Sequence, residues 1–378
     1  MGWLTKPWIL QAGIILVSVL LLLIGNLWAA SFTASHNYTL DHETYYRPNI
    51  NARVIEISSV ETTDTPIGTI TTTIFIAALT REGGREVVGI QQTFRHYGAQ
   101  PTPTRYVQPG DRILLQFLES YNMFELIEFL RIQYIAVLGA VIIAAIIAFG
   151  KIQGLNSLVS LALTVGAIFL VFVPAIAAGA NIYLAAILVC FYSTVSTLLI
   201  VIVPNKKSLC TMIGCLLSVA FVAFTIIIMD TFMQMTGVLD SDSIALITAN
   251  PDISLTGIIF AGVVIGAFGA IMDVSMSIAS SLWELRQTGG QNFKSICASG
   301  FNIGRDILGT MANTLVLAYI GSSLSVILLI FHHHSHNVFA VIHLETIIAE
   351  LLRALAGIAG IFLAIPITTL VCGRLYSE

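Results

Sequence analysis

Long apolar runs alternate with short polar segments along most of the chain. Runs of about 20 apolar residues, the length with which a helix crosses a bilayer, recur about eight times. They lie at roughly 8–28, 132–150, 155–174, 182–203, 209–229, 256–283, 306–331 and 346–371. One hydrophilic segment, 31–130, separates the first run from the second. The pattern predicts an α-helical polytopic membrane protein with about eight transmembrane helices and one domain outside the bilayer.

The same pattern divides the chain into three parts. We expect an N-terminal membrane anchor helix in residues 1–30, an extracytoplasmic domain in residues 31–130 and a seven-helix membrane domain in residues 131–378. The first run follows a short basic start and ends in NLWAAS, so a cleaved signal peptide is the alternative for residues 1–30. Its apolar core of about 21 residues is longer than a usual signal core, and this favours a retained anchor.

Basic residues set the expected orientation, because cytoplasmic loops of membrane proteins are enriched in lysine and arginine. With the N-terminus inside, the segments on the cytoplasmic side carry Lys6, Lys151, Lys206, Lys207, Arg286, Lys294, Arg305 and Arg374. The loops on the opposite side, 174–181, 230–254 and 332–337, contain neither lysine nor arginine. We therefore expect a cell (plasma) membrane protein with both termini in the cytoplasm and residues 31–130 outside.

Residues 31–130 have the pattern of β structure. Turn-forming clusters separate segments rich in β-branched and aromatic residues, namely RVIEIS at 53–58, TITTTIFIAAL at 69–79, EVVGIQQTF at 86–94 and RILLQF at 112–117. These segments fit a small β-rich domain, either an OB-like barrel or a short sandwich, and VQPGDRILLQF resembles a turn and strand of OB-like barrels. Its positive charges are all arginine, which indicates either a solvated surface or a surface for a wall polymer, a lipid headgroup or an envelope partner.

Composition excludes several classes of protein. Hydrophobic residues make up 56% of the chain and charged residues only 10%, whereas soluble domains have about 25% charged residues. A net charge of −4 offers no basic surface for nucleic acid. None of the cysteines falls in the polar segment, so neither a disulfide framework nor structural zinc is expected. No G-x-S-x-G turn, Walker A loop or H-E-x-x-H helix is present, and we expect neither an enzyme nor a cofactor.

One acidic residue interrupts the sixth run. Asp273 is the only charged residue between Leu255 and Trp283, and a carboxylate at the centre of a membrane helix costs about 2.5–3.5 kcal/mol. At helical spacing it shares a stripe with small and polar residues, namely Gly262, Gly266, Gly269, Ser277, Ser280 and Glu284. Glycines four apart permit close helix packing, so the stripe predicts a helix-packing seam in which Asp273 is shielded from lipid.

The seventh run offers a partner for this seam. Asp306, Thr310 and Asn313 share one face of it, and Arg305 precedes them. If the sixth and seventh runs pack antiparallel, Asp273, Ser277, Thr310 and Asn313 meet, with Arg305 as a counter-charge. Such a carboxylate is either a proton- or ion-coupling site or a polar clamp that fixes helix register.

Two further groups of polar residues lie between the later runs. Asp230, Asp240, Asp242 and Asp252 belong to the loop 230–254, which we expect to be solvated, while its part 243–254 is too short to span and fits a re-entrant or interfacial segment. Five histidines lie between 332 and 343, and His332, His333, His334 and His336 are candidate ligands for Zn²⁺, Ni²⁺ or Cu²⁺. Without neighbouring cysteines, a solvated loop is the favoured interpretation.

Residues 262–325 resemble the core of the YibE/F family of bacterial multi-pass membrane proteins. The resemblance rests on GAIMDVSMSIASS at 269–281, GRDILGTMANTL at 304–315 and AYIGSSL at 318–324. The order of an anchor, a small outer β domain and a helix bundle is also similar to that family, so the likeness covers most of the chain. It implies a bacterial membrane location and leaves the activity open.

A second resemblance concerns mechanism. Gly269-x-x-x-Asp273, a loop and a Gly-Arg start to the next helix are similar to SecD/SecF and other RND-type permeases, in which an acidic residue of such a helix carries protons. We therefore expect a secondary transporter or permease of an unknown small molecule, ion or peptide, coupled to protons through Asp273. The alternative is a non-transporting scaffold or envelope sensor whose outer domain docks a partner.

Overall fold

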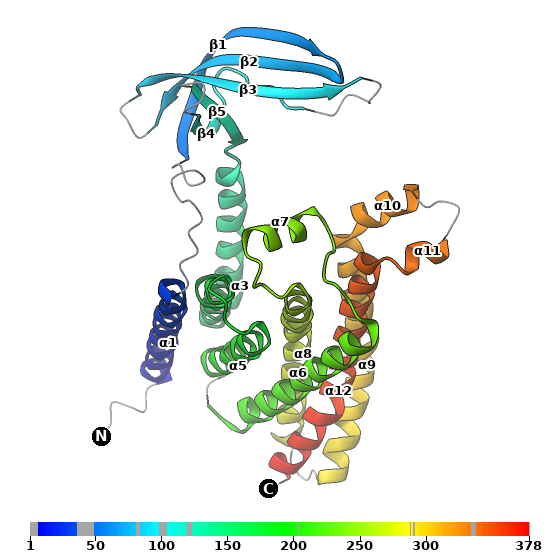
Figure 1. The fold of residues 1–378 in the computed structure, drawn as a ribbon. Coiled ribbons are helices and arrows are strands. Elements are labelled where there is room, and N and C mark those ends of the chain that lie inside the picture. The colour runs from blue at the N-terminus through cyan, green and yellow to red at the C-terminus, as the bar shows by residue number, and fades with distance from the viewer. Residues whose placement is uncertain are drawn as a thin grey trace. The chain divides into compact units, whose positions relative to one another are not determined.

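The structure, a computed structural model, describes residues 7–35, 49–80, 84–97, 104–118, 123–202, 204–287, 289, 292–333 and 338–377. Contacts between residues divide the chain into two units. One is Thr39–Ala145, and the other combines Met1–Tyr38 with Ile146–Glu378. The described strands all belong to the first unit, and helices build the second (Figure 1).

The strands form a closed barrel. They are β1 (Ile50–Thr65), β2 (Gly68–Leu79), β3 (Glu86–His96), β4 (Arg112–Leu118) and β5 (Met123–Phe129), in the order β1-β2-β3-β5-β4. Neighbours pair antiparallel except β3 and β5, which are parallel. The barrel alternative is therefore confirmed against the sandwich. The prediction lacked β5, because MFELIEF has two acidic residues and no β-branched residue except Ile127.

Alternating side chains fill the barrel. On β2, the residues Phe75, Ala77 and Leu79 are buried, as the two-residue period of a strand requires. Phe75 pairs with Gly89 of β3, where a Cβ atom would collide with the aromatic ring. Glycine at position 89 therefore makes room for the largest core side chain.

The helices are α1 (Pro7–Ser35), α3 (Ile132–Gly166), the π-helix η1 (Ala167–Phe172), α4 (Val173–Ala177), α5 (Ile182–Val201), α6 (Lys206–Met233), α7 (Ser241–Ala249), α8 (Leu255–Gln287), α9 (Phe293–Ser322), α10 (Leu324–His333), α11 (Val338–Ile342) and α12 (Glu345–Tyr376). Three of these helices, α5, α6 and α9, are capped at their N-terminus by an asparagine side chain. Asn181, Asn205 and Asn292 each accept a hydrogen bond from the backbone N–H three residues later, at 2.9–3.1 Å. These caps satisfy N–H groups that the first helical turn leaves free.

Six helical stretches of the described residues are long and apolar enough to cross a membrane. They are Gln11–Ala30, Ile132–Ala177, Ile182–Val201, Lys206–Met233, Leu255–Gln287 and Glu345–Tyr376. This finding indicates an integral membrane protein, but it does not confirm the expected count of eight. The stretch Ile132–Ala177 contains two of the predicted runs, and the non-helical torsions of Lys151 (φ 49°, ψ −128°) separate them.

The predicted span 306–331 is not a single helix. α9 begins at Phe293 and ends at Ser322, and α10 follows after Ser323. The amphipathic residues before 306 join the apolar ones in one long helix, because the cap at Asn292 sets the start thirteen residues earlier than the apolar run does.

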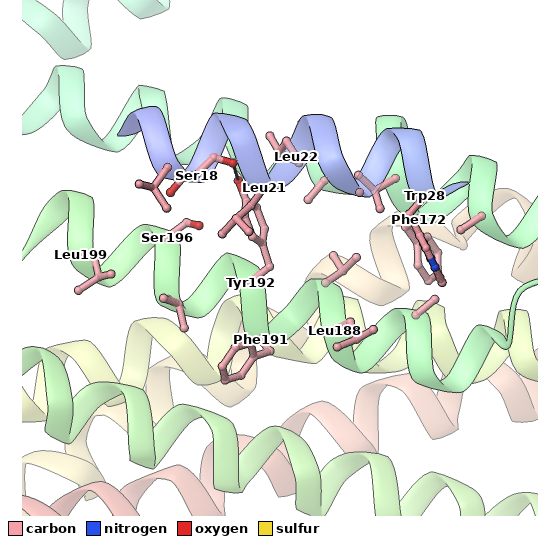
Figure 2. A pocket seen from close by; sticks show the side chains of 18 of the residues that line it. Ser18, Leu21, Leu22, Trp28, Phe172, Leu188, Phe191, Tyr192, Ser196 and Leu199 are labelled. Atoms are coloured by element: carbon pink, nitrogen blue, oxygen red, sulfur yellow. Dashed lines mark hydrogen bonds between the residues drawn. The ribbon is translucent and has the colours of Figure 1, made fainter. Parts of the chain in front are cut away.

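α1 contacts the other helices of its unit through only part of its surface. It lies against η1, α4 and α5, and the Tyr192 hydroxyl of α5 donates a hydrogen bond to the Ser18 carbonyl of α1 at 3.0 Å (Figure 2). Most of its large apolar side chains, Leu16, Leu23, Ile24 and Leu27 among them, are exposed. α1 thus has the surface of a lipid-facing helix.

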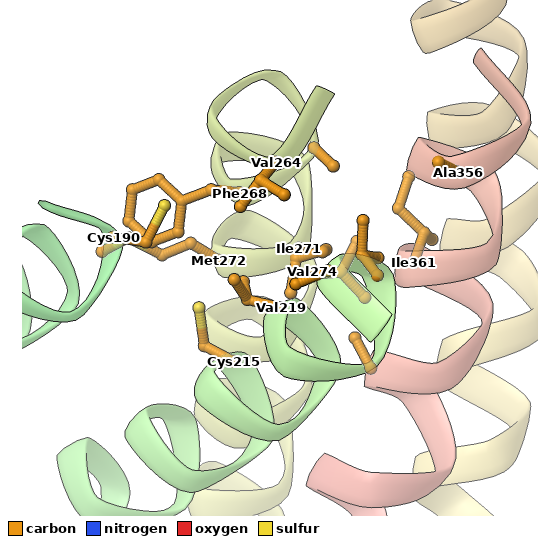
Figure 3. Close-up of a cluster of buried hydrophobic side chains, with 14 of the residues drawn as sticks. Cys190, Cys215, Val219, Val264, Phe268, Ile271, Met272, Val274, Ala356 and Ile361 are labelled. Atoms are coloured by element: carbon orange, nitrogen blue, oxygen red, sulfur yellow. The ribbon is translucent and has the colours of Figure 1, made fainter. Parts of the chain in front are cut away.

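The core of the helical unit surrounds α8. α8 packs against α12, α6, α5 and α9. Figure 3 shows Val264, Phe268, Ile271 and Met272 of α8 among side chains of α5, α6 and α12. Gly360 of α12 allows the close approach, since a Cβ atom there would contact Ile271 and Val222. Large apolar residues on one side of α8 therefore form the packing centre.

Candidate functional site

The stripe that contains Asp273 lies on the exposed side of α8. Gly262, Gly266, Gly269, Asp273 and Ser277 are all exposed, and Glu284 continues the exposed side while Ser280 is half-buried. The opposite side carries Ile271, Ile278 and Leu282, whose side chains are fully buried. The helical period thus separates a packed apolar face from an open face of small and polar residues.

The predicted seam of glycines is not found among the described residues. No heavy atom of the described residues lies within 4 Å of a Cβ atom built at Gly262 or Gly269. At Gly266 the nearest atom is the Tyr319 hydroxyl of α9, at 2.8 Å from such a Cβ. Neighbouring helices pack on the bulky face instead, where van der Waals contacts between large side chains hold membrane helices together. The expectation of a shielded stripe is therefore corrected to an exposed one.

Asp273 has no hydrogen bond or ion pair with another described residue. The thiol of Cys215 on α6 lies within range of its charge, but no cation contacts its carboxyl. Ser277, one turn further along, is likewise on the exposed face. The carboxyl is therefore free to take up or release a proton without breaking an interaction within the described chain.

The antiparallel pairing of α8 and α9 is found as expected. Leu282 of α8 lies against Gly300 of α9, and Gly266 lies against Tyr319, so the contact points run in opposite order along the two helices. Asp273 falls between these two points. α9 therefore lies beside the helix that carries the acid.

The polar residues of α9 do not bond to Asp273. Arg305, Asp306, Thr310 and Asn313 are all exposed. Arg305 Nη1 lies 3.5 Å from Asn302 Oδ1, and the Thr310 hydroxyl donates to the Ile307 carbonyl of its own helix at 3.0 Å. The structure thus places these residues on the helix beside α8 without forming the predicted cluster or counter-charge.

A pair of charges in α12 was missed by the sequence analysis. Arg353 Nη1 and Glu350 Oε1 form an ion pair at 2.5 Å, and these side chains are only 23% and 25% exposed. Both charged groups interact electrostatically with Tyr319, and the hydroxyl of Tyr319 lies against Gly266 of α8. A glutamate and an arginine three residues apart within an otherwise apolar run were the signal for this pair.

Two acidic side chains hold the segment before α8 in place by accepting hydrogen bonds. Asp240 caps α7, and its carboxyl accepts hydrogen bonds from the Ser243 N–H at 2.8 Å and hydroxyl at 2.7 Å. These bonds lower the pKa of the Asp240 carboxyl below its ordinary value. Glu345 of α12 similarly accepts bonds from the Gly237 N–H and the Thr236 hydroxyl. The loop 230–254 is thus an ordered segment that contains the short helix α7.

The histidine site receives no support from the described residues. His332 and His333 end α10, whereas His334 and His336 lie outside the residues that the structure describes. Within the described residues, no group of three or more His, Cys, Asp or Glu side chains could hold a metal ion.

Comparison with known proteins gives one match. The sequence model of a protein family described as YibE/F-like protein matches residues 138–378. No curated protein and no solved structure matches the chain. The resemblance to SecD/SecF and RND-type permeases gains nothing from these comparisons and stays a prediction.

Proposed function

Since the chain belongs to the YibE/F-like family of proteins, we propose that it is a membrane transporter or permease in which Asp273 carries protons. The observation that carries the proposal is an aspartate on an exposed face of a membrane-length helix, without a cation or hydrogen-bond partner among the described residues. We further propose a plasma-membrane location, with both termini in the cytoplasm and the barrel outside.

The energetics of a carboxyl in a membrane support this role. An ionised aspartate in hydrocarbon is costly, by about 2.5–3.5 kcal/mol on insertion scales, and the neutral acid form is favoured there. Contact with water reverses this preference. A carboxyl that meets apolar surroundings and water in turn therefore binds and releases a proton in each cycle.

The neighbouring side chains supply the rest of a polar path. Ser277 lies one turn from Asp273 on the same face, and Tyr319 meets that face two turns away at Gly266. Thr310 and Asn313 are exposed on the adjacent helix α9. The glycines of the stripe leave its surface open to a polar solute, because they add no side chains over it.

Proton uptake into vesicles tests the proposal. The full-length protein is reconstituted with a trapped pH-sensitive dye, and the dye reports proton entry under an imposed pH gradient. We expect Asp273→Asn to abolish protein-dependent uptake and Asp273→Glu to retain part of it. Asp242→Asn, an exposed acid in α7, is the matched control and keeps full uptake. Full uptake in Asp273→Asn, with normal insertion, would overturn the proton-carrier role.

The second candidate is a non-transporting scaffold, and the barrel offers one observation for it. Ile57, Val60 and Ile67 on and after β1 are 39%, 60% and 64% exposed. A docking surface requires such groups to form one contiguous patch, because apolar residues exposed singly are common on protein surfaces. Deleting residues 31–128 separates the candidates, because a scaffold then loses all function, whereas a transporter keeps Asp273-dependent proton uptake.

A further inference from the structure

An apolar cavity of the helical unit lies beside α1. It has a volume of about 820 Å³, within the range of sites that hold small ligands, and it lies between α1, the segment η1–α4 and α5 (Figure 2). Its walls include Val17 and Leu21 of α1, Val171 of η1, and Leu188 and Val189 of α5. One wall, α1, is far in sequence from the other two, which follow each other along the chain.

Local backbone features keep the cavity open. Gly13 contributes no side chain, and nothing lies within 4 Å of a Cβ atom built there. Gly25, by contrast, is held close to η1, since its Cβ position is 3.1 Å from Val171. α1 therefore lies close to the π-helix at Gly25, whereas its Gly13 position faces open space. π-Helical turns such as η1 are frequent at functional sites.

The chemistry of the walls excludes a polar ligand. Polar side-chain atoms in the lining come only from Ser18, Trp28, Tyr192 and Ser196. The Tyr192 hydroxyl already donates to the Ser18 carbonyl at 3.0 Å, and it also bonds to Ser196. Among the described residues, none with a charged side chain lines the cavity. A ligand here gains apolar contact and few hydrogen bonds.

We propose that this cavity binds one acyl chain of a membrane lipid, which contacts α1 on one side and α5 on the other. α1 and α5 are both apolar helices of membrane-spanning length, so their shared cavity lies at the depth of the hydrocarbon. Exposed wall residues such as Val17 and Leu188 show that the cavity is open at its side. An acyl chain thus enters laterally from the bilayer, while its headgroup stays outside the cavity and is not recognised by it.

Photocrosslinking tests this inference on the full-length protein. The protein is reconstituted in phosphatidylcholine vesicles that contain a trace of phosphatidylcholine with a diazirine on one acyl chain, and crosslinked residues are mapped by mass spectrometry. We expect crosslinks to concentrate on wall residues of α1 and α5. Val17→Trp, which fills the cavity, should lower this labelling several-fold.

The matched control is Leu16→Trp, because Leu16 is exposed on α1 but does not line the cavity. It should leave cavity labelling unchanged. Leu188→Trp, from the opposite wall, repeats the test if Val17→Trp fails to insert. Replacing phosphatidylcholine by phosphatidylglycerol should have no effect. Uniform labelling of all exposed apolar faces, insensitive to either cavity-filling variant, would overturn the inference, as would crosslinks that join two copies of the chain at these residues.

Discussion

The two faces of α8 carry different side chains and have different neighbours. One face presents large apolar residues, and Ile271, Ile278 and Leu282 on it are fully buried by the surrounding helices. The other presents glycine, serine and Asp273, and most of it lacks any neighbour within the described chain. α8 therefore packs through its large apolar side chains, whereas its small residues leave the other face open within the described residues.

The largest expected effect concerns the packed face. Ile271→Ala removes a fully buried side chain that lies against Gly360 of α12, and the cavity it leaves should lower the free energy of unfolding by about 2–5 kcal/mol. Chemical unfolding in detergent micelles measures this change. Ser277→Ala on the exposed face is the control and should change stability by less than about 0.5 kcal/mol. Equal losses would show that both faces are packed.

Substitutions of two glycines, one packed against a neighbouring helix and one open, should change stability in opposite directions. A Cβ atom at Gly304 of α9 would collide with Ile365 of α12, so Gly304→Ala should destabilise the protein by about 1–3 kcal/mol. Gly269→Ala meets no neighbour and should instead raise the free energy of unfolding by up to about 1 kcal/mol, because alanine favours helix. Thermal unfolding of both variants in micelles measures the difference. If Gly269→Ala destabilised the protein as Gly304→Ala does, the stripe would be a packing surface after all.

The stripe on α8 could be predicted from the sequence, but its environment could not. The spacing of Gly262, Gly266, Gly269 and Asp273 places them on one face, and the structure agrees. Whether another helix covers that face depends on distant residues such as Gly360, which lets α12 approach the opposite side. Periodicity separates the two faces of α8, but it does not show whether a further helix also covers the face of small residues.

The fold could be predicted to a similar degree. The length of the apolar runs predicted the membrane-length helices, and the alternation of apolar and polar residues predicted most strands of the barrel. The closure of the barrel requires β5 to pair with both β3 and β4, and such long-range pairing leaves no local signal. The start of α9 depended on the cap at Asn292, outside any apolar run.

The smallest expected effect on stability concerns Asp240, which, unlike Asp273, accepts hydrogen bonds from other described residues. Asp240 accepts two hydrogen bonds from Ser243, and its pKa is lowered in the folded state. Its stabilisation of α7 is therefore present above the ordinary aspartate pKa and is lost as the pH falls through the lowered value. Asp240→Ala should weaken α7 by about 1 kcal/mol near neutral pH, and Asp240→Asn should not, because asparagine also caps helices. Amide hydrogen exchange in α7, compared between variants at each pH, measures this. Equal exchange in wild type and Asp240→Ala at neutral pH would contradict the capping role.

The reactivity of Asp273 toward an apolar carbodiimide shows whether α8 presents an accessible acid that can be protonated. Such reagents enter membranes and modify carboxyl groups in their protonated form. In reconstituted full-length protein, we predict that Asp273 is modified, that the rate falls as the pH rises, and that Asp273→Asn loses this modification. An Asp273 that stays unmodified at every pH, while Asp306 on the exposed face of α9 reacts, would contradict the claim that α8 presents an accessible, protonatable acid.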